Sequence, residues 1–172
     1  MSGQNPAPLI LTLALDAAST TRFEALRREH FPPGRNLVPA HLTLFHHLPG
    51  DHLADITPAI AAACRERAPF AAEATGLRFL GRGVAYAVES AELRVLRAGL
   101  AHAWAPWLTP QDRQPFRPHV TVQNKAAPAE ARALLERLGA GLTPFPVRAE
   151  GLLLWRYLGG PWETAGRYPF AG

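Results

Sequence analysis

The sequence predicts an α+β fold: a bilobal arrangement of duplicated β-α-β-α-β units with pseudo-twofold symmetry and antiparallel-rich sheets lining a central groove. Three observations predict it. Strand-like and helix-like segments alternate in the same order twice along the chain, and two local sequence matches recur between the halves. The chain also has 172 residues, 48% of them apolar, which is enough to bury a core without disulfides.

The first unit begins with an apolar run at 9–15, which is typical of a buried strand. Thr-Arg-Phe-Glu at 21–24 matches a capping box and predicts the start of a helix that ends at Pro-Pro-Gly, residues 32–34. The remaining elements expected in this unit are a strand over 38–47, a helix opened by Thr57 and Pro58, and a strand over 70–80.

The second unit repeats this order. Residues 84–89 predict a strand, and Ser90 predicts the N-cap of an amphipathic helix. Pro128 is expected to open a further helix that Gly139 closes. The other elements expected are strands over 117–124 and 145–155, and a turn and one more strand in the tail to Phe170.

Two local matches support the duplication. His-Leu-Thr-Leu at 41–44 corresponds to His-Val-Thr-Val at 119–122, and the Pro-Phe and Gly-Leu pairs at 69–70 and 76–77 correspond to those at 144–145 and 151–152. A period near 75 residues is too long for a solenoid. We therefore expect a single bilobal domain over 1–172, with repeats at approximately 8–80 and 82–156 and a C-terminal extension at 157–172.

Composition excludes several classes of protein. A single cysteine cannot form an internal disulfide or a four-cysteine zinc site. The net charge of +4 comes from arginine, since Lys125 is the only lysine, and it favours an anionic ligand only modestly. No apolar run is long enough to span a membrane, and the stretch 8–18 lacks the basic flank of a signal peptide. We expect a soluble, cytoplasmic, monomeric protein.

The candidate catalytic residues are His41, Thr43, His119 and Thr121. Side chains alternate between the two faces of a strand, so each histidine shares a face with its threonine while apolar neighbours point to the core. If the two units pair about a twofold axis, two imidazoles and two hydroxyls meet across one cleft. A single His-x-Thr in a strand is weak support for a site, but two copies at matching places in a duplicated unit predict one.

This arrangement suits a phosphodiester substrate. Displacement at phosphorus needs one group that takes a proton from the attacking oxygen and another that gives a proton to the leaving oxygen. Two imidazoles can do both near neutral pH, and the threonine hydroxyls can bind the non-bridging oxygens. The scheme requires no metal or other cofactor, and it leaves open which histidine is the base.

The paired motifs, in a chain of this size, resemble those of the 2H phosphoesterase superfamily, and in particular the 2′-5′ RNA ligase-like or RNA 2′,3′-cyclic phosphodiesterase proteins. The resemblance covers nearly the whole chain, including the Arg-Pro-His context of His119. It implies a bilobal α+β fold, His41 and His119 as the acid–base pair, and Thr43 and Thr121 as phosphate ligands. The implied reaction is metal-independent hydrolysis of a 2′,3′-cyclic phosphate, on an RNA end or a nucleotide, to a 2′-phosphate.

The sequence departs from this pattern after the second motif. RNA-acting relatives often carry an arginine there, whereas this chain has Gln123, Asn124 and Lys125. Lys125 is the candidate replacement for that charge.

Five further residues are candidates for substrate binding. Arg117 shares the strand parity of His119 and could add attraction for phosphate, with a solvated arginine as the alternative. Phe45 shares the face of His41 and could contact a base or pack in the core. Trp155 and Tyr157 could stack on a nucleotide, and Lys125 completes the set.

A metal site is the weaker alternative. His46, His47 and His52 lie near His41 in the sequence, but strand alternation places His47 with His41 and His46 on the opposite face. Two other functions remain open. One is an RNA-end binding module without turnover, and the other is formation of a 2′-5′ bond between RNA ends.

Overall fold

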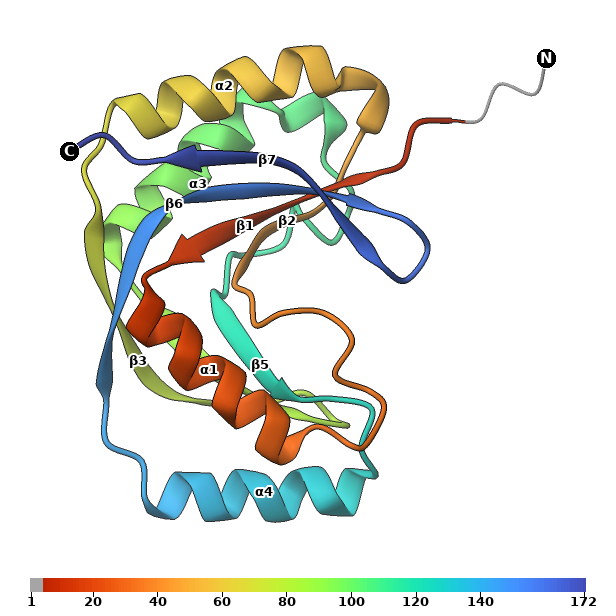
Figure 1. Cartoon of the computed structure of the whole chain (residues 1–172), viewed down its shortest axis with the longest axis vertical. Helices are drawn as coiled ribbons and strands as arrows, with labels where there is room; N and C mark the ends of the chain where they lie inside the picture. Colours follow the sequence, from red (N-terminus) through yellow and green to blue (C-terminus); the bar gives the residue numbers. More distant parts are fainter. Residues whose placement is uncertain (1–4) are drawn as a thin grey trace.

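The computed structural model describes residues 5–172 and confirms the α+β class. Figure 1 shows the fold coloured along the chain. Short 3-10 helices lie at Gly50–His52 and Ala105–Trp107. The helices and strands are β1 (Leu9–Leu15), α1 (Ala17–His30), β2 (Thr43–Leu48), α2 (Leu53–Arg65), β3 (Phe70–Phe79), β4 (Val84–Glu89), α3 (Ala91–Ala103), β5 (His119–Gln123), α4 (Pro128–Ala140), β6 (Phe145–Tyr157) and β7 (Trp162–Pro169).

The strands form one antiparallel sheet in the order β2-β1-β6-β3-β4-β5, with β7 also paired to β6. The long strand β6 joins the two halves of the sheet: residues 145–149 pair with β3, and the part from Gly151 onward pairs with β7. The outer strands also meet, because Leu42, next to β2, forms an isolated bridge with Val120 of β5. The sheet therefore brings its two edges together at the centres of the two His-x-Thr motifs.

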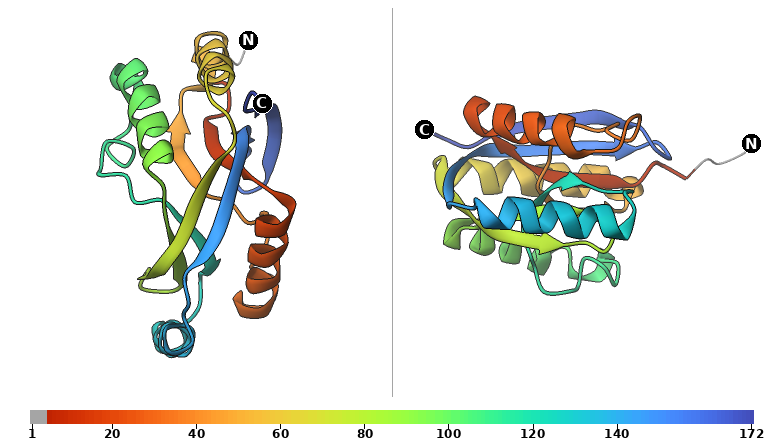
Figure 2. Two further views of the ribbon diagram at one scale, coloured as in Figure 1. Left: turned by 90° about the vertical axis from the view of Figure 1, so that its left-hand side faces the viewer. Right: turned by 90° about the horizontal axis from the view of Figure 1, so that it is seen from below.

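The helices cover the two halves of the sheet in pairs. Contacts of α1 with β5 and of α4 with β3 place these helices on one half, whereas α2 packs against α3, β6 and β7 on the other (Figures 1 and 2). The first helix of the first repeat thus lies against a strand of the second repeat, so the two repeats are interlocked in space. Within residues 5–172, no helix is both long enough and apolar enough to cross a membrane.

Several predicted boundaries are confirmed. The strands expected at 9–15 and 84–89 occur with those bounds, the tail adds β7, and Pro128 begins α4. Ser90 is the N-cap of α3, and its hydroxyl oxygen accepts a hydrogen bond from the backbone N–H of Leu93 at 3.2 Å.

Two predicted helix starts are wrong. Helix α1 begins at Ala17, because Asp16 is the N-cap and accepts a hydrogen bond from the Ser19 N–H at 3.0 Å. Within the expected capping box, Glu24 instead accepts a 2.6 Å bond from the N–H of Ala40, next to the first motif. Helix α2 begins four residues before Thr57, and Pro58 lies inside its second turn.

The strand expected at 38–47 is shorter and irregular. Its pairing with β1 shifts twice, since Thr12 pairs with Thr43, Leu11 with Phe45, and Leu9 with Leu48. Each shift adds one residue to β2 and reverses the faces of the side chains that follow. Phe45 is therefore fully buried rather than in the groove.

Phe45 is a core residue. Its ring packs edge-on against Trp104, with ring centres 5.1 Å apart, and the Arg97 guanidinium lies 4.2 Å from its ring centre. These contacts correct the expectation that Phe45 could contact a substrate base.

Candidate active site

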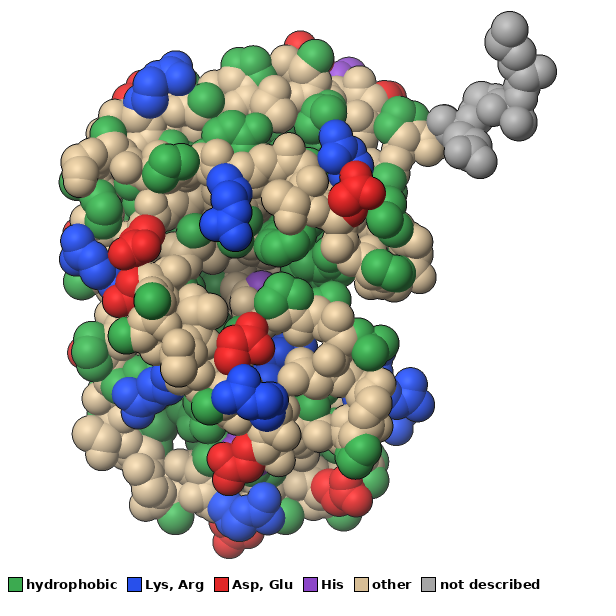
Figure 3. Space-filling model, viewed as in Figure 1, with side chains coloured by type: hydrophobic (Ala, Val, Ile, Leu, Met, Phe, Trp, Pro, Cys, Tyr) green, Lys and Arg blue, Asp and Glu red, His purple; other side chains and the backbone are tan. Residues whose placement is uncertain are grey.

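The motif side chains of both repeats line a single cavity of about 170 Å³. Because Leu42 and Val120 are paired and buried, the residues on either side of each of them point to the opposite face, into the groove between the halves. Figure 3 shows the surface hollowed between the two halves, next to the β6–β7 hairpin. We call this space the two-histidine cavity; it is lined by Ile10, His41, Thr43, His46, His119, Thr121 and Trp162.

The two imidazoles are held in the same way. His41 Nδ1 lies 2.8 Å from the carbonyl oxygen of Pro39, and His119 Nδ1 lies 2.8 Å from that of Arg117. A carbonyl oxygen only accepts hydrogen bonds, so in both rings Nδ1 carries the proton and donates it. In the neutral form of each ring, Nε2 is then the nitrogen that can take up a proton.

Burial and neighbouring cations favour the neutral form of both rings. Burial lowers the pKa of His41 to about 4, and the charges of Arg27, His119 and His46 act in the same direction against the bond to Pro39. Burial also lowers the pKa of His119, with a further contribution from Arg78. Arg78 Nη1 lies 3.3 Å from His119 Nδ1. An anion between the rings would offset these effects, because it favours the charged imidazolium.

Two buried arginines connect each repeat to the motif strand of the other. Arg27 of α1 donates to the carbonyl oxygen of Thr121 at 2.9 Å, to that of Val38 at 3.1 Å and to Asn36 Oδ1 at 3.0 Å. Its guanidinium therefore ties β5 to the loop that leads to His41.

Arg97 of α3 makes the reciprocal connection. It donates to the carbonyl oxygen of Leu44, next to the first motif, at 3.1 Å and to that of Asp112 at 2.6 Å. The two motif strands are thus held by charged hydrogen bonds from helices of the opposite repeats.

Asp112 stabilises the irregular part of β2. Its carboxylate is 1% exposed and accepts hydrogen bonds from the backbone N–H groups of His46 and His47 at 2.9–3.0 Å. The His46 imidazole donates a further bond at 3.0 Å. Burial alone would raise the pKa of Asp112, but these bonds hold it below its usual value.

The position of His46 corrects the alternation argument. The pairing shifts in β2 turn His46 into the two-histidine cavity, beside His41. His47 instead lines a separate cavity near Pro6 and Pro8, and His52 stacks on Trp107 with ring centres 4.3 Å apart. Among residues 5–172, no three His, Cys, Asp or Glu side chains are grouped as a metal site requires.

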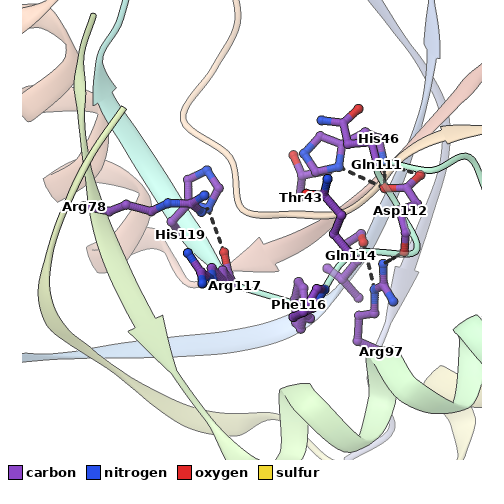
Figure 4. A pocket seen from close by; sticks show the side chains of 12 residues that line it. Thr43, His46, Arg78, Arg97, Gln111, Asp112, Gln114, Phe116, Arg117 and His119 are labelled. Carbon is purple, nitrogen blue, oxygen red and sulfur yellow. Dashed lines mark hydrogen bonds and ion pairs between the residues drawn. The ribbon is translucent and has the colours of Figure 1, made fainter. Parts of the chain in front are cut away.

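A second cavity of about 460 Å³ adjoins the first on the His119 side. Figure 4 shows Arg78, Arg117 and His119 on one side of it and Thr43, His46, Gln111 and Asp112 on the other. We call it the arginine cavity; its other lining residues are Leu44, Arg97, Gln114, Pro115 and Phe116. Arg117 therefore lies at the groove, as expected, although β5 begins two residues after it and the strand expected over 117–124 is shorter.

A third cavity, of about 300 Å³, lies on the His41 side and is lined by aromatic and basic residues. Lys125 and Tyr157 both line it, together with His41, Thr121 and Trp162. We call it the aromatic cavity. The cation that follows the second motif is therefore on the opposite side of the groove from the arginine cavity.

Trp162, rather than Trp155, is the tryptophan at the site. Its ring centre is 4.6 Å from that of His41, and Trp155 packs behind it at 5.8 Å. Trp155 is held there by a 2.9 Å hydrogen bond from its Nε1–H to the buried Thr12 hydroxyl. Trp155 thus supports Trp162 and lines none of the three cavities.

Sequence reasoning missed Trp162, Arg27, Arg97, Asp112 and Arg78. The two buried arginines do have a signal in the sequence. In the first helix of each repeat, an arginine follows a buried apolar residue by four positions: Arg27 follows Phe23, and Arg97 follows Leu93. No comparable signal exists for Asp112, which lies in the irregular segment between α3 and β5.

Comparison with known proteins agrees with this geometry. Residues 15–161 match the family model of the 2′-5′ RNA ligase superfamily. No curated protein sequence is significantly similar to the chain.

Two solved structures of similar fold illustrate the match. The chain resembles TT0787 of Thermus thermophilus with a TM-score of 0.66 and 21% identity, over 96% of this chain and 98% of that one. It resembles LigT of Escherichia coli, in complex with 3′-AMP, with a TM-score of 0.65 and 19% identity, over 97% of this chain and 99% of that one. The family match covers most of the chain, which therefore belongs to the 2′-5′ RNA ligase superfamily of 2H phosphoesterases, a membership that supports an activity on phosphodiester bonds.

Proposed function

We propose that this protein is a metal-independent phosphodiesterase that hydrolyses the 2′,3′-cyclic phosphate of an RNA end or a nucleotide to a 2′-phosphate. The observation that carries the proposal is the two-histidine cavity, in which two imidazoles with anchored Nδ1 atoms and two threonines line one space. The reaction needs one proton acceptor and one proton donor at the same phosphorus. Two imidazoles in one cavity can supply both.

In the proposed reaction, a water oxygen attacks phosphorus while the bond from phosphorus to O3′ breaks. One imidazole takes a proton from the water at Nε2, and the other donates a proton to O3′, which leaves as a hydroxyl. The product keeps its phosphate on O2′. The Thr43 and Thr121 hydroxyls donate hydrogen bonds to the non-bridging oxygens, where negative charge builds up in the transition state.

We assign the role of base to His41. Burial, Arg27 and the other imidazoles lower its pKa to about 4, so His41 is neutral across the physiological range and can accept a proton. We assign the role of acid to His119, which becomes charged when the phosphate anion lies against its ring.

The aromatic cavity supports a nucleotide as the substrate. Trp162 beside His41, together with Tyr157 and Lys125, offers a stacking surface and a positive charge for a base and its phosphate. LigT of E. coli, which shares the fold, forms complexes with 3′-AMP, with ATP and with NADP+. All four motif side chains come from one chain, so one copy supplies the whole two-histidine cavity. We propose that the enzyme is a cytoplasmic monomer.

The test is an activity assay on purified protein with a panel of 2′,3′-cyclic nucleotides and short RNAs that end in a cyclic phosphate, in the presence of EDTA. Phosphorus NMR identifies the product, and a 2′-phosphate is expected. His41→Ala and His119→Ala should each lower the rate by about 10³-fold or more, with unchanged circular dichroism. His47→Ala is the matched control, because His47 lies on the same strand but lines a separate cavity.

Four other results of these experiments would contradict the proposed activity. Near-wild-type activity in either motif variant would exclude two-histidine catalysis. Loss of activity in EDTA with recovery in zinc would favour a metal enzyme. Tight, salt-sensitive RNA binding without product would indicate a binding module, and joined ends would indicate a ligase.

A further inference from the structure

The arginine cavity adjoins the proposed reaction centre. It shares Thr43, His46 and His119 with the two-histidine cavity, so a phosphate bound between the imidazoles would lie at its entrance. With a volume of about 460 Å³, against about 170 Å³ for the two-histidine cavity, it has room for a further part of the same substrate. The cavity is therefore placed to receive a substrate group next to the scissile phosphate.

The lining of the arginine cavity is strongly cationic. Three guanidinium groups line it, and Asp112 is the only carboxylate among the residues that do so. The Asp112 oxygens are taken up by two backbone amides and the His46 imidazole, so its charge is balanced locally. Ion pairs found within residues 5–172 include neither Arg78 nor Arg117, so no carboxylate in this part of the chain neutralises these two cations.

The donors of this cavity suit a phosphate group. Arginine presents a planar fork of N–H groups that matches two phosphate oxygens. Arg78 and Arg117 lie on the same side of the cavity in Figure 4, on β3 and on the segment before β5, and both are close to His119. The guanidinium of Arg97 already donates to the backbone of Leu44 and Asp112, which leaves Arg78 and Arg117 as the candidates for binding an anion.

The chemistry of the substrate limits where this anion can be attached. In a nucleoside 2′,3′-cyclic phosphate, both O2′ and O3′ are already bonded to the scissile phosphorus. A second phosphate on the same ribose must therefore be carried by O5′, either as a terminal phosphate or as the linkage to the preceding nucleotide.

We propose that the arginine cavity is a second anion subsite, in which Arg117 and Arg78 bind the phosphate on O5′ of the substrate. The enzyme then prefers cyclic ends that carry an O5′ phosphate over nucleosides with a free 5′ hydroxyl. This inference rests on the proposed function, because the two-histidine cavity defines where the scissile phosphate lies.

The kinetic test compares three substrates with the same base: the 2′,3′-cyclic nucleotide with a free 5′ hydroxyl, the same compound with a 5′ phosphate, and a dinucleotide with a cyclic end. For the wild type, both O5′-phosphorylated substrates should show KM values lower by about tenfold or more, the advantage expected of charge-assisted hydrogen bonds. A lower KM for the 5′-phosphorylated nucleotide alone would indicate that the subsite recognises a terminal phosphate dianion. An advantage confined to the dinucleotide would place its origin in the added nucleoside and would overturn the subsite.

Arg117→Gln is the decisive variant, because the Arg117 side chain makes no hydrogen bond with the described residues and its loss leaves the His119 contact to the backbone intact. In this variant, the KM for the substrate with a free 5′ hydroxyl, divided by the KM for either O5′-phosphorylated substrate, should fall to about one. Arg167→Gln, which removes an exposed arginine from β7, is the control and should keep the wild-type ratio. A wild-type ratio near one, or a ratio unchanged by Arg117→Gln, would overturn the inference.

A binding experiment separates this inference from the proposed function. Calorimetry at fixed ionic strength compares a nucleoside 3′-monophosphate with the 3′,5′-bisphosphate, neither of which has a cyclic ester to open. Tighter binding of the bisphosphate by about tenfold, lost in Arg117→Gln, would support the subsite even if no cyclic phosphate were hydrolysed. Equal affinities would refute the subsite whether or not the enzyme is a phosphodiesterase.

Discussion

Replacement of His41 by glutamine should make the protein more resistant to acid. His41→Gln keeps a polar side chain at the motif but removes the group whose pKa burial lowers to about 4. The variant should therefore lose less stability than the wild type when the pH falls from 7 to 4.5, although its activity is expected to be lost.

The size and sign of the effect follow from the two protonation states. At pH 7 the imidazole is neutral in both the folded and the unfolded chain, so it makes no difference to stability. As the pH falls below 6.5, the unfolded chain binds a proton that the folded chain does not bind until about pH 4, and unfolding becomes more favourable. A fall of the pKa from 6.5 to about 4 corresponds to about 2–3 kcal/mol of lost stability, the lower figure allowing for water that reaches the partly buried ring.

The measurement is urea unfolding followed by tryptophan fluorescence at several pH values between 7 and 4.5. The wild type should lose about 2–3 kcal/mol more than His41→Gln over this interval. His102→Gln, which removes an exposed imidazole from α3, should follow the wild type. Parallel pH dependences of the wild type and His41→Gln would refute the conclusion that burial keeps His41 neutral, and with it the assignment of His41 as the base.

Two further predictions concern the buried charged groups. Arg27→Met retains most of the side-chain volume but removes three hydrogen bonds, so it should cost about 3 kcal/mol and lower the Tm by about 6–12 °C in a thermal scan; a change below about 2 °C would contradict its structural role. Asp112→Asn puts an amide donor where backbone N–H groups need an acceptor, so it should cost about 2–3 kcal/mol in urea unfolding, whereas Asp51→Asn on the surface should cost less than about 0.5 kcal/mol.

The features predicted correctly from the sequence depend on local patterns. Mostly apolar runs marked β1 and β4, and Ser90 marked the start of α3, because each signal lies within a few residues of what it predicts. The recurring His-x-Thr pattern pointed to the four side chains that line the two-histidine cavity, since side chains alternate in β5 and on either side of Leu42, which is bridged to Val120 just before β2.

The predicted alternation of side chains between the two faces of a strand is wrong where the pairing of β2 with β1 shifts. Two extra residues in β2 turned Phe45 into the core and His46 into the groove, and no local signal marks them. The irregular segment is held by a residue far away in the sequence, because Asp112 accepts hydrogen bonds from its consecutive N–H groups. Contacts over such a separation arise only from the folded chain, as does the packing of Trp162 against His41.

The reciprocal arginines explain why neither repeat can form the site alone. Arg27 belongs to the first repeat but bonds to the backbone of Thr121 in the second, and Arg97 belongs to the second but bonds to the backbone of Leu44 in the first. The bridge between Leu42 and Val120 joins the same two strands. Each motif strand is therefore held in position by the opposite repeat. The two imidazoles come together only when the two repeats pack against each other. Loss of the Arg97 side chain from α3 should consequently disturb Thr43 before it disturbs Thr121, although Thr121 and α3 belong to the same repeat.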